Sequence, residues 1–275
     1  MSGDFPEYRV TARNTAAASE NAIHDDEVAR QYGFRGGLVP GVTVYAYLTH
    51  PLVEAWGREW LARGTASVRF SRPVLEGEEV RVSGAVTERS ASGVTAALTA
   101  MTVSGGECAT ATASLPAAPP APAAAATWAT APLPAERPAA TREHLAAVSV
   151  LGTPVTLYDE AAAADYLDKV SDALPLYRGR EGLVHPAFYL DQANRALDRN
   201  VLMGPWIHVG SVIQHLSLAR VGERLSTRGR VVSLFEKKGR EFVEADLLIV
   251  AGEAARPVAH VVHTAIYRLP APSPA

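Results

Sequence analysis

The pattern of hydrophobic and polar positions predicts the same arrangement twice along the chain. Two series of segments alternate with a period of two, as strands do, and Gly, Pro or Ser separates neighbouring segments. Such spacing is typical of antiparallel hairpins. The first series comprises 66–70, 79–86, 94–103 and 108–115, and the second comprises about 206–218, 223–235, 240–250 and 257–268.

A long apolar segment precedes each series and predicts a helix. Residues 42–56 are almost uncharged, which favours a buried helix over an amphipathic surface helix, and 186–197 is the corresponding helix of the second half. A shorter helix through Tyr32 follows Asp25, with acidic residues in its first turn. The simplest architecture is an α+β fold in which an antiparallel sheet wraps one long helix, twice. The two sheets are expected to continue edge to edge.

Short sequence landmarks also repeat. Gly37-Leu38-Val39 recurs at 182–184, an offset of 145 positions, and Gly77-Glu78 recurs at 222–223 with the same offset. Gly106-Glu107 recurs one residue later than that offset, at 252–253. We infer a duplicated domain, in which one copy can keep its packing residues and lose its chemistry.

A segment rich in Pro and Ala separates the copies, and its prolines favour a stiff, extended connector. The predicted organisation is therefore an N-terminal domain at 1–115, a linker at 116–140, a C-terminal domain at 141–270 and a tail at 271–275.

Composition excludes several classes of function. The chain has 275 residues, of which 48% are hydrophobic, and its net charge of -3 offers no cationic field for nucleic acid. We find neither an apolar stretch of membrane-spanning length nor an export signal, so we expect no membrane partner and a cytoplasmic location. Cys108 cannot form an internal disulfide, and the alternation around it predicts a small buried side chain on a strand.

In the first copy, Asn21-Ala22-Ile23-His24 precedes the short helix, and Phe34-Arg35-Gly36-Gly37-Leu38-Val39-Pro40-Gly41 leads into the buried helix. This arrangement resembles the MaoC-like (R)-specific enoyl-thioester hydratase family. Its signature is approximately Gly-Asp-x-Asn-Pro-(apolar)-His, followed by a segment ending (apolar)-Val-His-Gly at the central helix. The resemblance covers 5–115, whereas the second half matches mainly in layout, with Gly182-Leu183-Val184-His185-Pro186 before its helix.

The resemblance implies a double hotdog fold and an acyl-thioester substrate, carried by CoA or by an acyl-carrier protein, with no cofactor. A homodimer agrees with the resemblance, because double hotdogs of the family often pair, and a monomer is the alternative, because one chain already supplies two copies. His24 falls on the catalytic histidine of the family and Asn21 on the asparagine of the motif. Gly41 falls on the glycine whose backbone N–H faces the thioester carbonyl.

The chain departs from the family at the catalytic aspartate, which should stand five residues before the histidine, where this chain has Ser19. In the family the two residues jointly hold and deprotonate water, and a positioned base contributes roughly 10² to 10⁴ in rate. Glu20 would reach the position if the loop shifted by one residue. In the second copy we place the counterpart of His24 near 156–160, where there is no histidine, so neither half carries a complete dyad.

The remaining candidate site residues surround the start of the first long helix. Backbone N–H groups of Gly41 and Val42, after Pro40, would stabilise negative charge on a thioester carbonyl. Asn21 either bonds its own loop or contacts substrate. Tyr45 either packs the helix or borders an acyl tunnel, and His185 is either a second polar group at the cleft or a helix-start residue. The histidines predicted on strands lack metal-binding spacing, so no metal site is expected.

These observations favour an acyl-thioester hydratase or dehydratase, a lyase that adds or removes water across the 2,3 bond with a non-standard dyad. One alternative is a hotdog protein that binds an acyl or polyketide-like ligand without converting it. Another is a hotdog thioesterase or cyclase, although the carboxylate that thioesterases carry on the central helix has no counterpart in 42–48.

Overall fold

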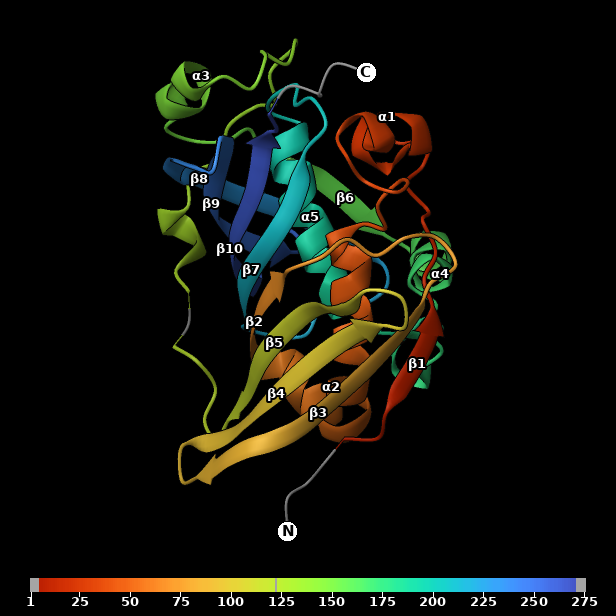
Figure 1. Cartoon of the computed structure of the whole chain (residues 1–275). Coiled ribbons are helices and arrows are strands. Elements are labelled where there is room, and N and C mark those ends of the chain that lie inside the picture. The colour runs from red at the N-terminus through yellow and green to blue at the C-terminus, as the bar shows by residue number, and fades with distance from the viewer. Residues whose placement is uncertain (1–4, 122, 271–275) are drawn as a thin grey trace.

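The computed structural model describes residues 5–121 and 123–270, so the predicted tail at 271–275 lies outside the described residues. These residues form one ten-stranded antiparallel sheet in the order β1-β3-β4-β5-β2-β7-β10-β9-β8-β6 (Figure 1). The strands of the first half are β1 (Tyr8–Thr11), β2 (Thr65–Phe70), β3 (Glu79–Ser90), β4 (Gly93–Thr102) and β5 (Gly106–Pro116). Those of the second half are β6 (Val155–Tyr158), β7 (Ile207–His215), β8 (Glu223–Lys237), β9 (Arg240–Ala251) and β10 (Arg256–Arg268).

The two halves of the sheet join at its centre. Strands β2 and β7 pair antiparallel, from Thr65 opposite Gln214 to Arg69 opposite Gly210. Outward from this seam, the strand order of one half matches that of the other in reverse. This arrangement confirms the predicted α+β double hotdog with a continuous sheet, in which the pairing of β2 with β7 removes one exposed edge from each half.

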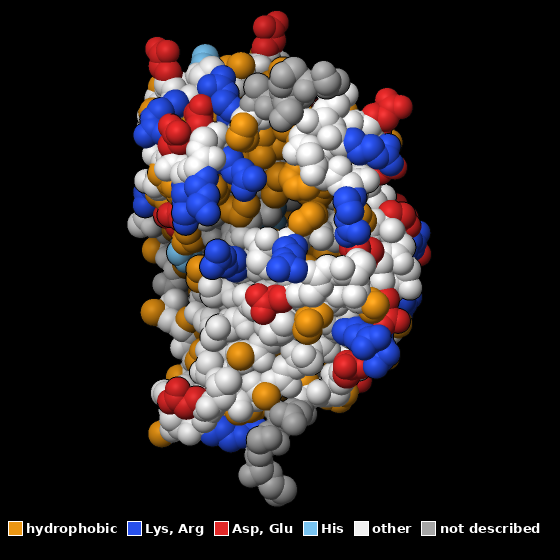
Figure 2. Space-filling view, viewed as in Figure 1, with side chains coloured by type: hydrophobic (Ala, Val, Ile, Leu, Met, Phe, Trp, Pro, Cys, Tyr) orange, Lys and Arg blue, Asp and Glu red, His pale blue; other side chains and the backbone are white. Residues whose placement is uncertain are grey.

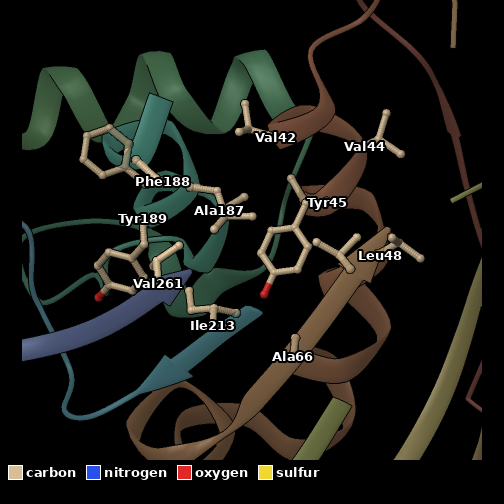
Figure 3. Close-up of a cluster of buried hydrophobic side chains, with 14 of the residues drawn as sticks. Val42, Val44, Tyr45, Leu48, Ala66, Ala187, Phe188, Tyr189, Ile213 and Val261 are labelled. Carbon is tan, nitrogen blue, oxygen red and sulfur yellow. The ribbon is translucent and has the colours of Figure 1, made fainter. Parts of the chain in front are cut away.

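Two central helices lie side by side within the curve of the sheet (Figure 1). Helix α2 (Gly41–Arg63) and helix α5 (Pro186–Asp198) begin 145 positions apart, as the sequence repeat predicts. Helix α2 is longer than predicted, and it bends at Gly57, whose φ of 54° is one that glycine adopts without strain. Figure 3 shows the core between the helices, where Tyr45 of α2 lies near Ala187 of α5 and Ile213 of β7.

Shorter elements complete the fold. They are the helices α1 (Asp26–Gln31), α3 (Arg142–Ala147) and α4 (Glu160–Val170), with 3₁₀ turns at Ala22–His24, Ala125–Thr127 and Pro175–Tyr177. Asp25 caps α1 as predicted, because its side chain accepts hydrogen bonds from the N–H groups of Glu27 and Val28. The sequence pattern did not predict α4 or the four-residue edge strands β1 and β6.

Cys108 lies on β5 and is 1% exposed, and burial raises the pKa of its thiol to about 11. The prediction of a small buried side chain on a strand is therefore confirmed. Among the described residues, no helix is both long and apolar enough to span a membrane.

Candidate functional site

Two cavities meet beside the N-terminus of α2. The larger, the polar cavity, has a volume of about 860 Å³ and lies among the loop at 15–24, α4 and α5. The smaller, the apolar cavity, has a volume of about 250 Å³ and lies among the segments at 34–44 and 70–74 and the start of β7. Both are lined by Asn21, His24, Pro40, Asn194 and Trp206.

His24 lies where the two cavities meet, and its neighbours determine which of its ring nitrogens carries the proton. Its Nδ1 lies 2.6 Å from the carbonyl oxygen of Leu38, and because a carbonyl only accepts, Nδ1 carries the proton. Nε2 is then the basic nitrogen, and it lies 3.2 Å from Nδ2 of Asn21. Burial lowers the pKa of His24, so the imidazole is neutral at pH 7. The structure thus holds a half-buried neutral base next to the start of α2.

Asn21 joins the two halves of the chain. Its Nδ2 donates to the carbonyl of Trp206 over 3.0 Å, and its Oδ1 accepts from the N–H of Trp206 over 3.1 Å. The same oxygen caps the 3₁₀ turn that carries His24 by accepting from the N–H of Ile23. The asparagine therefore orients the histidine and ties its loop to the segment that leads into β7.

Gly37 makes room for His24. A Cβ atom at this position would lie well inside contact distance of the backbone carbonyl of His24. Gly37 is not among the residues with positive φ, so space rather than an unusual backbone angle requires glycine here. Its counterpart Gly182 shows the same feature, since a Cβ there would lie 2.5 Å from the carbonyl oxygen of Tyr177.

Replacing Gly37 by alanine is expected to destabilise the fold by about 1–3 kcal/mol, because the added methyl group must displace backbone. The shift should also move His24 and lower any activity that depends on it. Urea unfolding of Gly37→Ala measures the first effect. Gly204→Ala is the control, since a methyl group there meets open space. Equal stability of the two variants would contradict this explanation of Gly37.

The N-terminus of α2 reaches both cavities. The first N–H groups that bond within the helix are those of Thr43 and Val44, which both donate to the carbonyl of Pro40. No side chain caps this end, so the N–H groups of Gly41 and Val42 are the ones left for a ligand among the described residues. Gly41 lines the apolar cavity and Val42 the polar cavity. The predicted carbonyl-binding position therefore coincides with the junction of the cavities.

Ser19 and Glu20 line the polar cavity, but both face outward. The Ser19 hydroxyl lies 3.4 Å from the backbone oxygen of Asn21, and the Glu20 side chain is 76% exposed. Arg137, from the predicted linker, donates to Glu20 over 2.8 Å, and this hydrogen bond lowers the pKa of Glu20. The same guanidinium donates to the backbone oxygen of Asp198. Glu20 thus forms an ion pair at the mouth of the cavity.

The counterpart of His24 in the second copy is Tyr177, and our placement of it near 156–160 was wrong. Leu38 donates its N–H to the carbonyl of Ile23, and Leu183 donates in the same way to Leu176, so the two 3₁₀ turns are equivalent. Asp172 then stands five residues before Tyr177, at the position where the first copy has Ser19. One copy therefore keeps the histidine and the other keeps the aspartate.

The carboxylate of Asp172 is already paired with groups of the protein itself. Its carboxylate lies 3.3 Å from Nε2 of His185 and 3.2 Å from Nδ1 of His50 on α2, and it accepts from the N–H of Leu174. Burial alone would raise its pKa, but the two histidines hold the pKa of Asp172 well below its usual value. His185 is fully buried and caps α5 through Nδ1. Of the two predicted alternatives for His185, the structure supports the helix-start residue. His185 lines neither cavity.

Tyr45 also lies away from the candidate site. It is fully buried in the core between α2 and α5 and lines neither cavity (Figure 3). We therefore leave Tyr45 and His185 out of the proposed site.

A histidine of β7, which the sequence did not single out, lines the apolar cavity. A Cβ atom at Gly41 would lie 3.1 Å from Nδ1 of His208, and Nε2 of His208 lies 2.8 Å from the hydroxyl of Ser211. The pairing of β7 with β10 shifts register at Thr264, so Val209 is an extra residue in β7. This bulge breaks the period of two and turns His208 and Ser211 toward the same buried face.

Helix α5 contributes a polar stripe to the polar cavity. Asn194 and Arg195 follow Asp191 by three and four residues and precede Asp198 by four and three, which places the four side chains on one helix face, and all four line the cavity. Burial raises the pKa of Asp191, and it raises that of Asp198 to about 6 despite the nearby Arg199. Sequence spacing alone could have marked this stripe, but not the cavity that it faces.

Comparison with solved structures finds similar folds at low identity. A putative MaoC domain protein dehydratase from Chloroflexus aurantiacus is 12% identical with a TM-score of 0.64, covering 98% of this chain and 95% of that one. A Mycobacterium tuberculosis protein described as a double hotdog is 16% identical with a TM-score of 0.63, covering 96% of each chain. A putative oleoyl thioesterase from Lactobacillus plantarum is 11% identical with a TM-score of 0.57, covering 98% of each.

Comparison at the level of sequence gives no match. No protein-family model matches the sequence, and no curated protein matches it. At these identities, similarity to solved structures establishes the fold alone. The chain is thus a double hotdog protein, with the architecture that MaoC-like dehydratases and several thioesterases share.

Proposed function

We propose that this protein is an acyl-thioester hydratase or dehydratase that uses His24 as its base. One observation carries the proposal: the basic Nε2 of a half-buried neutral histidine stands where two cavities meet the free N–H groups of α2. A thioester carbonyl at the N–H groups of Gly41 and Val42 would place its 2,3 bond near His24. The helix dipole adds to the stabilisation of negative charge at that position.

The proposed hydration begins when Nε2 of His24 takes a proton from water as the water oxygen bonds to carbon 3. The electron pair of the 2,3 double bond moves toward the carbonyl, giving an enolate that the N–H groups of Gly41 and Val42 stabilise. The imidazolium then returns its proton to carbon 2, so that one water molecule is added in total. The reverse sequence removes water from a 3-hydroxyacyl thioester. CoA or an acyl-carrier protein would carry the acyl group, and the protein would act without a cofactor, as a homodimer.

The carboxylate missing at Ser19 has candidate replacements across the polar cavity. Asp191 and Asp198 lie on α5 and line the polar cavity, and burial raises the pKa of Asp191 and brings that of Asp198 to about 6. We propose that one of them helps to hold the water or the 3-hydroxyl group opposite His24.

The same two carboxylates support a second candidate function, thioester hydrolysis. The first long helix has no carboxylate at 42–48, which argued against a thioesterase, but α5 supplies two that line the same cavity as His24. In that reaction the carboxylate would direct water to the carbonyl carbon and the thiol would leave. The putative thioesterase from Lactobacillus plantarum has a similar fold.

Product analysis of the wild-type protein separates these functions. The purified chain is incubated with 2-enoyl, 3-hydroxyacyl and saturated acyl thioesters of CoA. We expect loss of the conjugated-thioester absorbance with the 2-enoyl ester, its appearance with the 3-hydroxyacyl ester, and no release of free thiol. Release of thiol from the saturated ester would establish the thioesterase instead. Binding of the esters with neither product would leave only a ligand-binding role and contradict both enzymes.

A further inference from the structure

The apolar cavity lies between two separate groups of hydrophobic side chains. One is the small α1 cluster, formed by Ile23, Ala29 and Leu38 with Phe34 and Ile207 packed against it. The other is the main core of the sheet and the central helices. Both groups supply walls of the cavity, and the walls that belong to the main core include Val39, Val44, Val74 and Trp206. The gap between the two groups is therefore bounded by apolar side chains on both sides.

The polar groups of this cavity do not interrupt its apolar interior. Among the described residues that line it, Arg72 and Arg240 are exposed, and Asn21 and Asn194 lie where it joins the polar cavity. His208 is buried, and burial lowers its pKa, so it is neutral. Figure 2 shows a hollow with a hydrophobic floor on the face between β7 and α1. A hydrocarbon chain in this cavity would remove apolar surface from water, which is favourable.

The polar cavity offers a different environment. Its walls carry side chains of both charges, among them Lys169 and Arg195 together with Asp191 and Asp198. A hydrocarbon chain there would remove water from these groups without replacing its hydrogen bonds, which is unfavourable. The arm that carries the acyl group, in CoA and in carrier proteins alike, contains amides that both donate and accept hydrogen bonds. Walls of mixed charge suit such an arm.

The position of the thioester connects the two cavities. Gly41 lines the apolar cavity and Val42 the polar cavity, so a carbonyl oxygen at their N–H groups lies at the junction, beside His24. The acyl chain and the sulfur leave the carbonyl carbon in different directions. One of them therefore extends into each cavity.

Resting on the proposed function, we propose that the substrate is an apolar acyl thioester of medium length, with its chain in the apolar cavity and its carrier arm in the polar cavity. The volume of the apolar cavity sets the length. A cavity of about 150 Å³ holds benzene, so one of about 250 Å³ holds roughly ten carbon-sized atoms. A shorter chain leaves part of the gap beside the α1 cluster unfilled, whereas a longer chain must extend into water.

Binding of a series of acyl chains tests this length without relying on turnover. The analogues are 2-oxoalkyl thioethers of CoA, which keep the carbonyl but cannot release the thiol, with chains matching butyryl, hexanoyl, octanoyl, decanoyl and tetradecanoyl groups. Calorimetric titration of the wild-type protein should show binding that tightens by about two- to fourfold for each CH₂ group up to roughly ten carbons. The tetradecanoyl analogue should then gain less than about threefold over the decanoyl analogue, because its last carbons stay in water. Equal affinity from butyryl to decanoyl would overturn the proposal, as would an undiminished gain up to tetradecanoyl.

Substitutions in the walls of the apolar cavity test where the chain lies. Val209→Phe, on β7, should weaken the decanoyl analogue by about tenfold or more relative to the butyryl analogue, because the added ring occupies the space of the chain. Phe34→Ala, on the loop between α1 and α2, should weaken it by about fivefold on the same scale, because apolar contact is lost. Val212→Phe is the matched control, since Val212 is exposed on the same strand and lines neither cavity.

A substitution in the polar cavity completes the test. Ala162→Phe, on α4, should weaken all five analogues alike, because it narrows the space for the arm that they share. If Ala162→Phe instead removed the gain for each CH₂ group, while Val209→Phe and Phe34→Ala kept it, the chain would lie in the polar cavity and the proposal would be wrong. Because no catalysis is measured, these results stand apart from those that test the hydratase itself.

Discussion

Replacing His24 by alanine is expected to lower kcat/KM for hydration of 2-enoyl thioesters by roughly 10² to 10⁴, the contribution of a positioned base. The loss should lie mainly in kcat, because the N–H groups of Gly41 and Val42 and the walls of both cavities remain. Steady-state rates on matched 2-enoyl and 3-hydroxyacyl thioesters measure the effect. His260→Ala is the matched control, since His260 is partly exposed and bonds to Asp246 on the sheet.

The pH dependence of the same reaction follows from the state of His24. Its pKa lies below the ordinary value of about 6.5 because the side chain is largely withdrawn from water. A base with a lowered pKa stays unprotonated to lower pH, so activity should persist below pH 6.5 and fall only as the pH passes the lowered value. Unchanged turnover in His24→Ala would remove this residue from the mechanism. Loss of folding in that variant, checked by circular dichroism, would instead assign it a structural role.

Acidification is expected to unfold the protein between about pH 6 and pH 4, because several histidines are buried in the neutral form. Burial lowers the pKa of His215 and His263 to about 3 each, and it also lowers those of His185 and His208. In the unfolded chain these side chains titrate near 6.5. The stability that they contribute is therefore complete above pH 6.5 and is lost as the pH falls toward their folded pKa values.

The size of this effect approaches the stability of a typical domain. At pH 4.5, His215 and His263 together would lower the free energy of unfolding by about 5 kcal/mol, at about 1.4 kcal/mol for each pKa unit. Asp198 acts in the opposite direction. Because its pKa in the folded state is raised to about 6, its protonation adds about 2 kcal/mol to the free energy of unfolding at the same pH. His185 and His208 add to the loss. Because native proteins are stable by about 5–15 kcal/mol, the remaining stability should be small.

Urea unfolding at several pH values between 7.5 and 4.5 measures this loss. His215 packs against Trp60 and Tyr189, and neither of its ring nitrogens has a partner among the described residues. His215→Phe should therefore reduce the number of protons taken up on unfolding by up to one, and so lower the slope of the free energy of unfolding against pH. His144→Gln, on the exposed side of α3, should leave the dependence as it is. A midpoint that does not change from pH 7.5 to 4.5 would show that these histidines bind protons in the folded state.

A single sequence offset could not locate the segment of the second copy that corresponds to the loop around His24. The offset of 145 holds from Gly37 to Glu78, but Tyr177 follows His24 by 153 positions, because the second copy has a shorter segment between its 3₁₀ turn and its central helix. A signal was present: Asp172 and Pro175 keep their motif positions relative to Tyr177. The substituted Leu174 and Tyr177 hid it, and hydrogen bonding revealed the equivalence.

By itself, the sequence determined the double hotdog architecture and one wall of the candidate site. The strands follow from a period of two, the central helices from long apolar segments, and the motif from Asn21 to Gly41 is local, so all three can be read along the chain. The tertiary structure alone decided the opposite wall. Pairing of β2 with β7 brings Trp206 to Asn21 across 185 positions and sets α5 against the same cavity. No periodicity of the chain encodes such contacts, because they arise from the packing of one copy against the other.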